Sequence, residues 1–400
     1  MARPTAVTSA TQEPRLGFRL YGTLALLSAL APLGTDFYLP GLPDISASLG
    51  TTSGLVQLTI SINFVGLAIG QIVIGTLSDR IGRRRPLVAC MALFVVFTVL
   101  CGLAPNIWVL LAARFAQGFV AGAVAIPRAI VRDMFPPSVV SKVFSQLTAV
   151  AMFAPVVAPV IGGAILAFTS WRVIFAALAV IAVVQLVLAH RVVPESLPPE
   201  RRHASGRAQR RVMLMMLRDR RFAGFVVTAG LQGAQLMVYL SLSAFFLRDE
   251  YGVSTQGYSA LFALNGLGLI LASQINARLL STQELPRVAR LFALTTVTAI
   301  VSLLALIVAG APLAAVEVAL FVSIAASGPG IANIMGLAMT PMGHAAGTAS
   351  ALLGSSTFLI GAIVAAVVAH VSTSGVAMAS TMAVAATLIA MLTWALTRRD

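Results

Sequence analysis

Long apolar segments alternate with short polar loops along nearly the whole chain of 400 residues. Each segment holds about 20 residues, the length that a helix needs to cross roughly 30 Å of hydrocarbon at 1.5 Å per residue. The pattern predicts twelve spans, at residues 18–39, 55–77, 87–104, 107–131, 139–168, 171–190, 222–247, 258–280, 288–309, 313–339, 347–369 and 376–396. The predicted fold class is an all-α integral membrane protein with 12 transmembrane helices.

One long polar segment divides these spans into two sets of six. Residues 191–221 contain PESLPPERRHASGRAQRR and are predicted to form a flexible basic linker at the level of the lipid headgroups. We therefore expect six-helix bundles at 18–190 and 222–396, with short tails at 1–17 and 397–400. A signal peptide ending near Ala31 is the alternative at the start, but the apolar run continues past that residue and cleavage would leave an odd number of spans.

The second spans of the two sets resemble each other. INFVGLAIGQI at 62–72 aligns with LNGLGLILASQI at 264–275, so that Asn63 matches Asn265. This similarity favours two pseudo-symmetric bundles that arose by duplication. Duplicated halves place a substrate site near the membrane midplane, between them.

Composition agrees with a membrane protein: 58% of the residues are hydrophobic and 10% are charged, against about 25% charged in soluble proteins. The net charge of +14 would suggest nucleic acid binding in a soluble chain. Here the basic residues cluster in alternate loops, and only Arg172 and Arg248 fall on the other side. The positive-inside rule then predicts both termini to be cytoplasmic. Cys90 and Cys101 lie about 16 Å apart on one predicted helix, too far to form a disulfide.

The most informative loop is GTLSDRIGRRR at 75–85. Gly75 would let helices approach closely and Gly82 would permit a tight turn. Asp79 would accept hydrogen bonds from a facing helix N-terminus and pair with an arginine. A loop that only sets orientation would explain the arginines, but not Asp79 or the spaced glycines.

This loop resembles the G-x-L-x-D-R-x-G-R-R signature of the major facilitator superfamily at every position. With the pattern of six plus six spans, the resemblance covers the whole chain and implies the major facilitator fold. It also implies a conformational latch that includes Arg80, in which Asp79 holds the outward-open state by contacting the opposite half and Arg83 pairs with Asp133. The corresponding loop of the second half, 276–290, lacks the acid, so the latch is expected on one side only.

Arg114 is the one basic residue that lies deep inside a predicted span, away from the span ends. An unpaired arginine at that depth costs about 2.5–3.5 kcal/mol even on the mildest scale, so it should face the interior and find a partner. The segment RFAQG, with Gln117, resembles the family's R-x-x-Q-G motif, which implies a role in proton transfer. The alternative is a structural arginine that bonds carbonyls near a helix break.

Asp36 and Glu317 are the only acids inside predicted spans. A carboxyl among apolar groups favours its neutral form and can carry a proton. The stretch TDFYLPGLP, with Asp36 and Tyr38, resembles TDMYLPALP of the bicyclomycin/chloramphenicol-resistance (Bcr/CflA) type of drug:proton antiporter, which implies that Asp36 couples protons. Ser28 stands where some relatives carry a second acid. Glu317, predicted near the outer end of its span, could instead snorkel toward water.

Two further groups complete the candidate site. APVVAPVIGG in the fifth span resembles the family's antiporter motif and implies a hinge at Pro155, Pro159, Gly162 and Gly163. Gln232, Gln235 and Tyr239 recur at i, i+3 and i+7, so they share one face, which is expected to line the cavity. The remaining cavity candidates are polar residues within spans, although single amides often only tie helices together: Tyr38, Asn63, Gln117, Gln146, Asn265, Glu317 and Asn333.

These features predict a proton-coupled antiporter in the bacterial inner membrane that exports small neutral or lipophilic antibiotics by alternating access. An exporter or importer of a small metabolite is the first alternative. An intramembrane enzyme is a remote one, because the four histidines lie at span ends or in loops: His190, His203, His344 and His370. Drug-like small molecules, protons and the lipid bilayer are the expected partners. We expect a monomer with no cofactor, no metal and no nucleic acid partner.

Overall fold

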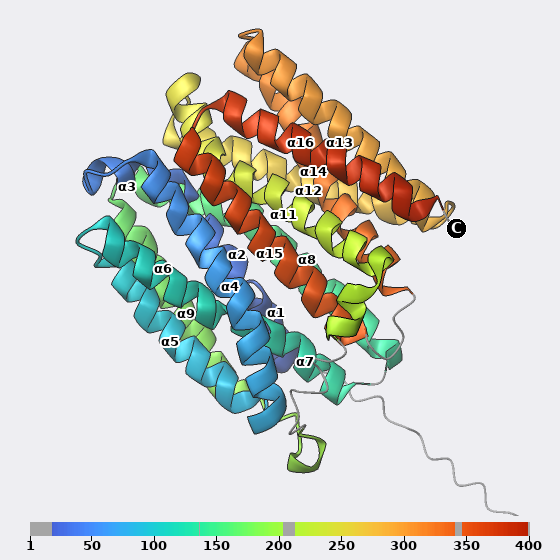
Figure 1. Cartoon of the computed structure of the whole chain (residues 1–400). Coiled ribbons are helices and arrows are strands. Elements are labelled where there is room, and N and C mark those ends of the chain that lie inside the picture. Colours follow the sequence, from blue (N-terminus) through green and yellow to red (C-terminus); the bar gives the residue numbers. More distant parts are fainter. Residues whose placement is uncertain (1–17, 136, 203–212, 341–345, 399–400) are drawn as a thin grey trace, which may run out of the picture.

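The computed structural model describes residues 18–135, 137–202, 213–340 and 346–398, and every regular element in these ranges is a helix (Figure 1). The N-terminal half consists of α1 (Phe18–Ser28), α2 (Leu30–Asp36), η1 (Leu39–Gly41), α3 (Leu42–Ser48), α4 (Ser53–Ile81), α5 (Arg84–Gly102), α6 (Ile107–Ala121), η2 (Gly122–Val124), α7 (Ala125–Met134), α8 (Pro137–Leu166) and α9 (Trp171–Val192). After η3 (Pro199–Arg201), the C-terminal half consists of α11 (Arg220–Phe245), the π-helical turn η4 (Phe246–Glu250), α12 (Thr255–Leu280), α13 (Leu285–Val308), α14 (Leu313–Met339), α15 (Ala346–Val371) and α16 (Gly375–Thr397).

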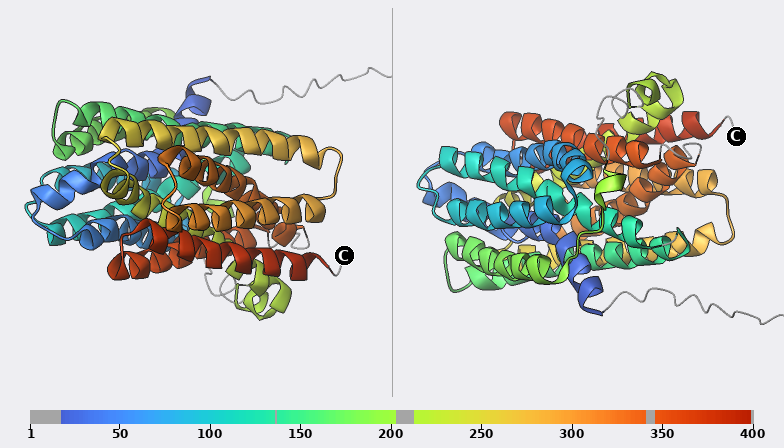
Figure 2. Two further views of the ribbon diagram at one scale, coloured as in Figure 1. Left: turned by 90° about the horizontal axis from the view of Figure 1, so that it is seen from above. Right: turned by 90° about the horizontal axis from the view of Figure 1, so that it is seen from below.

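Ten helices in the described residues are long and apolar enough to cross a membrane, or eleven if the bent pair at the start counts as one span. In addition, α8 has an apolar described stretch at Phe153–Leu166. The long helices of both halves share one general direction when seen from above and from below (Figure 2). Large apolar side chains stay exposed on the outside, for example Val180 and Val318 at 65% each, as a hydrocarbon environment requires. The multi-pass helical class is thus confirmed, and the count of twelve stays a prediction.

The first predicted span differs from a single straight helix. It bends by 40° between Ser28 and Leu30. Pro32 is the physical reason, because a proline has no N–H to donate and its ring clashes with the carbonyl four residues earlier, here that of Ser28. The bend lets the segment from Leu30 to Ser48 follow a separate path to the end of the molecule.

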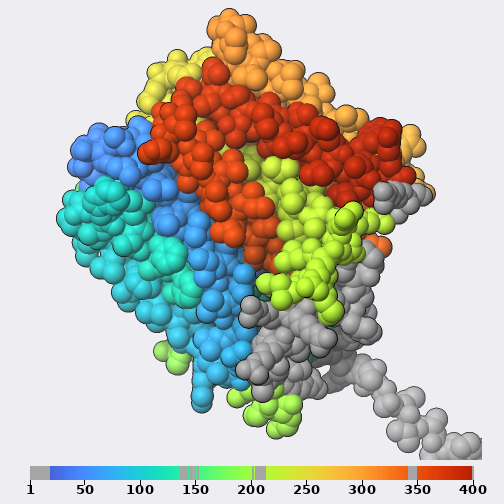
Figure 3. Space-filling view, viewed as in Figure 1, coloured from blue at the N-terminus to red at the C-terminus, as the bar shows by residue number. Residues whose placement is uncertain are grey.

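The two halves meet along two pairs of long helices. α4 packs against α15, and α8 packs against α12. In the space-filling view, α15 lies directly against α4 (Figure 3). Phe64 of α4 and Phe358 of α15 stack with their ring centroids 5.6 Å apart. Any site at the boundary between the halves is therefore framed by these four helices and by the helices that they enclose.

The two ends of the molecule differ in the elements that they carry. The linker end carries the turn at Gly82 and Arg83, together with Glu195. The far end carries α3 and η4. At the far end, η1 and α3 both lie against α11, so the two halves are in contact there.

Candidate functional site

Asp36 ends α2 and lies at the boundary between the two halves. Its side chain is 4% exposed, and Thr35 Oγ1 donates a hydrogen bond of 3.1 Å to its Oδ1. The carboxyl also interacts electrostatically with two tyrosines of the C-terminal half, Tyr239 on α11 and Tyr258 on α12. The acid is therefore buried inside the protein, close to the opposite half, and is not exposed to lipid.

Arg114 on α6 supports the segment that carries Asp36. It is fully buried, and its Nη1 donates to the carbonyl oxygen of Gly34 at 2.9 Å and to Oε1 of Gln117 at 2.5 Å. Its guanidinium lies 4.3 Å from the centre of the Tyr38 ring. In the described residues its Nε and Nη2 have no hydrogen-bond partner. The cation is thus stabilised by a carbonyl, an amide and an aromatic face, and no carboxylate contacts it there.

The other polar candidates of the N-terminal half hold this arrangement in place. Gln117 Nε2 donates to Thr98 Oγ1 at 2.8 Å, and Asn63 Nδ2 donates to the carbonyl of Arg114 at 2.8 Å. The Tyr38 hydroxyl lies 3.0 Å from Thr59 Oγ1. Each of these contacts joins segments inside the N-terminal half. Gln117 and Asn63 thus tie helices together, the alternative to lining the cavity that was expected for single amides.

Two of the expected hinge residues of α8, Gly162 and Gly163, lie against both halves of the protein. A Cβ atom at Gly162 would collide with the carbonyl of Phe37, directly after Asp36, and one at Gly163 would collide with Ser259 of α12. Pro159 is buried and Pro155 is partly buried within the same helix. The paired glycines therefore allow α8 to pack closely against the end of α2 and against the opposite half.

A second buried carboxyl lies in the C-terminal half. Glu317 on α14 is 7% exposed, and its Oε1 accepts a hydrogen bond of 3.0 Å from Asn265 Nδ2 on α12. The same Nδ2 lies 3.2 Å from the Tyr239 hydroxyl. Asn265 follows Thr255, the first residue of α12, by ten residues, which is about 15 Å along a helix and about half the hydrocarbon thickness. The expectation that Glu317 could snorkel to water is wrong, because Asn265 holds it inside the protein.

Three cavity candidates lie elsewhere in the C-terminal half. Gln232 and Gln235 border a cavity of about 10 Å³ between α11, α13, α14 and α16, with room for one water at most. Gln235 Nε2 also donates to the carbonyl of Met382 at 3.4 Å. These two side chains therefore face the interior of one half and not the boundary between halves. Asn333 donates to Asn276 Oδ1 at 2.9 Å and ties α14 to α12. Gln146 lies in a part of α8 whose side chains are outside the described residues.

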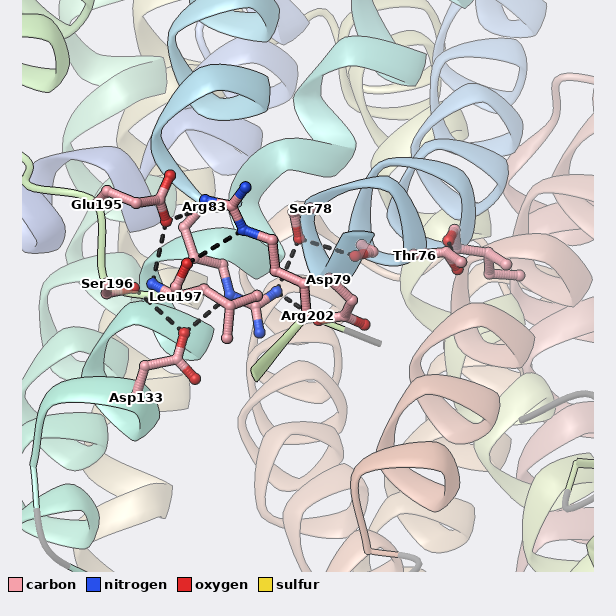
Figure 4. A network of polar contacts seen from close by, with 11 residues as sticks. Thr76, Ser78, Asp79, Arg83, Asp133, Glu195, Ser196, Leu197 and Arg202 are labelled. Carbon is pink, nitrogen blue, oxygen red and sulfur yellow. Dashed lines mark hydrogen bonds and ion pairs between the residues drawn. The ribbon is translucent and has the colours of Figure 1, made fainter. Parts of the chain in front are cut away.

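The charged turn at the linker end forms a compact network (Figure 4). Arg83 joins both acids of the predicted latch: its Nη1 lies 2.5 Å from Asp79 Oδ1 and its Nε lies 2.9 Å from Asp133 Oδ2. Gly82 has φ of +103°, a conformation that side chains disfavour, so the predicted turn requires a glycine. Arg80 is exposed. The role expected of Gly75 is not seen here, because a Cβ at that position would meet nothing within 4 Å.

Sequence reasoning missed the contribution of the linker to this network. Glu195 accepts hydrogen bonds from the backbone N–H of Arg83 at 2.8 Å and of Arg84 at 3.3 Å, so it caps the N-terminus of α5. Partial burial acts to raise its pKa, but the N–H donors of Arg83, Leu197 and Arg84 outweigh this and lower the pKa of Glu195 below its usual value. Ser196 donates to Asp133 Oδ2 at 3.2 Å. The only available signal was an isolated acid between prolines in a basic segment.

The two ends differ in how the halves are joined. At the far end, Arg248 of η4 donates to Asp44 Oδ1 at 3.3 Å and to the carbonyl of Pro40 at 3.2 Å, both in the N-terminal half. At the linker end, the contacts given for Asp79, Arg83 and Asp133 in the described residues stay within the N-terminal half and the linker. Polar contacts thus join the two halves at the far end of this conformation.

Fold and buried charge together define the class: a multi-pass helical protein in two halves, with carboxyls buried between and within them. A family model of the Major Facilitator Superfamily matches residues 24–366, and the chain belongs to this family. The family recognised in the charged loop is thereby confirmed.

Relatives and solved structures agree with this assignment. The chain is 38% identical to "Uncharacterized MFS-type transporter YdgK" of Bacillus subtilis (strain 168), over 94% of each chain. It is 31% identical to "Bicyclomycin resistance protein homolog" of Haemophilus influenzae, over 87% of this chain and 88% of the relative. Among solved structures, "Crystal structure of D-xylose-proton symporter" superposes with a TM-score of 0.78 at 16% identity, covering 93% of this chain and 97% of the other, a likeness of fold alone.

Proposed function

We propose that the protein exports small neutral or lipophilic compounds, such as chloramphenicol-like or bicyclomycin-like antibiotics, in exchange for protons. The observation that carries this proposal is the buried Asp36 carboxyl at the boundary between the halves, where Gly162 of α8 packs against Phe37 and Gly163 packs against Ser259 of the opposite half. A carboxyl in that place changes its surroundings whenever the halves move against each other. The Haemophilus relative, named for bicyclomycin resistance, supports the class of substrate.

In the proposed arrangement, twelve spans form two six-helix bundles at 18–190 and 222–396. The linker 191–221 and both tails lie on the cytoplasmic side of a bacterial inner membrane, because the basic loops gather at that end. The protein works as a monomer, because each chain contains both halves of the site.

The described conformation then corresponds to the inward-facing state of an alternating-access cycle. Arg248 closes the far end, which faces the outside. Asp79, with its side chain 35% exposed, is free to accept bonds from the opposite half when the linker end closes. Gly75, which packs against nothing in this conformation, would let the helices approach at that stage. Pro155, Pro159, Gly162 and Gly163 provide the hinge.

Protonation of Asp36 drives the cycle. Facing outside, the acid binds a proton; facing inside, it releases the proton as a drug binds from the cytoplasm or the inner leaflet. Arg114 takes part by fixing the Gly34 carbonyl, two residues before the acid, and so positions Asp36. One charge moved across about 150 mV supplies roughly 3.5 kcal/mol, enough for about a 300-fold gradient of a neutral drug.

Transport into inverted membrane vesicles tests the proposal. Wild-type protein should accumulate labelled chloramphenicol in energised vesicles and lose it when a protonophore is added. The Asp36→Asn variant should fail to accumulate the drug, whereas Glu284→Gln, at an exposed site before α13, should behave like wild type. Uphill transport by Asp36→Asn with an unchanged pH dependence would refute the coupling role.

A further inference from the structure

The contact between Glu317 and Asn265 leaves two acceptor atoms without a partner. Glu317 Oε2 and Asn265 Oδ1 are both buried, and neither has a hydrogen-bond partner in the described residues. The two groups are already joined, because Asn265 Nδ2 donates to Glu317 Oε1 at 3.0 Å. A buried polar atom without a partner costs about 1–3 kcal/mol, so two of them on neighbouring groups require an explanation.

A charged Glu317 would have no cation to stabilise it in the described residues. The ionisable groups near it are phenols: Tyr239 on α11, and beyond it Tyr258 on α12. On the other helices that pack against α14, α13 has its arginines, Arg287 and Arg290, in its first two turns at the linker end. α15 has His370, exposed in its last turn. An isolated carboxylate in such surroundings is strongly disfavoured relative to the neutral acid.

We infer that Glu317 is a second proton-binding site of this transporter, and that it is protonated in the conformation described. A proton on Oε2 turns that oxygen into a donor, and Asn265 Oδ1 is the unpartnered acceptor on the group already bonded to it. The acid and the amide then form two antiparallel hydrogen bonds, Nδ2–H to Oε1 and Oε2–H to Oδ1. One added proton satisfies both buried atoms and removes the buried charge.

A metal ion fits these atoms less well than a proton. Hard cations such as Ca²⁺ take six to eight oxygen ligands, whereas the oxygens gathered here are those of Glu317, Asn265 and the Tyr239 hydroxyl. A proton needs only one donor and one acceptor atom. The oxygens present in the described residues therefore match a proton.

The two acids are linked through one side chain. The Tyr239 hydroxyl contacts Asn265, the partner of Glu317, and Tyr239 also lies within electrostatic range of Asp36. Movement of α11 against the N-terminal half would therefore change the surroundings of both carboxyls together. This part of the inference rests on the proposed function and gives it a second coupled proton, one in each half.

Infrared spectroscopy of the purified protein without any substrate tests the proton site by itself. Wild-type protein at neutral pH should give the C=O stretching band of a protonated carboxylic acid, and Glu317→Gln should lack that component. The glutamine has the shape of the protonated acid and makes the same two bonds with Asn265, so the variant should fold. Glu284→Gln is the control for loss of an exposed carboxyl, and it should leave the band unchanged. A spectrum that is identical in wild type and Glu317→Gln would overturn the inference, as would displacement of the band by sodium ions.

Transport stoichiometry tests the coupling separately. With two protons per drug, a tenfold change in the proton gradient should change the accumulation of a neutral drug about 100-fold in wild type and about tenfold in Glu317→Gln. If drug accumulation depended equally on the proton gradient in both proteins, Glu317 would have no part in coupling, even if the infrared band had shown that it is protonated. If neither protein accumulates drug while the band behaves as expected, the proposed substrate class fails and the proton site stands.

Discussion

In the residues that the structure describes, the two halves of the molecule each bury one acid within the helices, but they stabilise it by different means. In the N-terminal half, Arg114 bonds the backbone two residues before Asp36, and Thr35 bonds the carboxyl itself. In the C-terminal half, the acid Glu317 is bonded to the amide of Asn265, and no cation contacts it in the described residues. Arg114 therefore acts on Asp36 through the backbone, whereas the amide of Asn265 bonds the Glu317 carboxyl directly. The difference indicates that duplicated bundles can keep matching helices while their buried charges diverge.

Of the substitutions that test this difference, the replacement of Arg114 should have the largest effect on transport. Arg114→Leu removes the bonds to Gly34 and Gln117, leaves their oxygens buried without a donor and frees the segment that carries Asp36. Drug accumulation in inverted vesicles, normalised to the amount of folded protein, should fall at least about 100-fold, in line with the loss of two hydrogen bonds to a charged group. Arg114→Lys keeps the charge but has no planar guanidinium to lie over the Tyr38 ring, so it should retain an intermediate activity.

A matched variant separates this positioning role from a general loss of charge. Arg278→Leu removes an exposed arginine from the last turn of α12 and should leave accumulation unchanged. If Arg114→Leu folded and transported as well as Arg278→Leu, the support of Asp36 by Arg114 would be disproved.

The second prediction concerns the amide partner in the C-terminal half. Asn265→Leu removes the only hydrogen bond given for the Glu317 carboxyl in the described residues, and we expect a loss of about 1–3 kcal/mol in the free energy of unfolding. Asn333→Leu is the control, because it breaks an amide–amide contact between the same two helices, α14 and α12. Both variants should lower the melting temperature, but only Asn265→Leu should also shift the pH dependence of transport. Identical pH profiles would show that Asn265 serves packing alone.

The sequence predicted those parts of the site that depend on local residue pattern. The turn at Gly82 and the burial of Asp36 follow from the local pattern of residue types, whereas the Arg83–Asp133 pair was expected only from the resemblance to the family. The Asn265–Glu317 bond and the cap by Glu195 could not be predicted, because they join segments that only the folded chain brings together. The stripe of Gln232 and Gln235 illustrates the limit: a polar face in a membrane helix avoids lipid, but the pattern does not say which interior it faces.

The third prediction addresses the contact that joins the halves at the far end. Arg248→Gln removes a partly exposed ion pair with Asp44, an interaction worth about 0.2–1 kcal/mol, so the population open at the far end should rise by up to about fivefold. The labelling rate of a cysteine introduced at Ser46, which borders a groove of about 420 Å³ at that end, measures the change. Arg172→Gln is the control, because the polar and ring contacts given for Arg172 in the described part of the chain, with Ser48, Ala104 and Trp171, stay within its own half. An equal change in both variants would exclude a role of Arg248 in closing the far end.

The smallest effect is expected at the exposed cap of α5. Because the pKa of Glu195 is lowered in the folded protein, its contribution to stability is present above the unfolded pKa and is lost as the pH falls through the folded pKa. The protection of the Arg83 and Arg84 amides against hydrogen exchange should therefore decrease on acidification below the usual glutamate range. Glu195→Gln should lower this protection by up to about fivefold at neutral pH and remove its acid dependence, since exposed charge contacts are weak. Glu200→Gln, a neighbouring acid on η3, should leave both properties as in wild type. Unchanged protection in Glu195→Gln would mean that the cap does not hold the latch turn in place, and that the side-chain contacts of Arg83 with Ser78, Asp79 and Asp133 hold it instead.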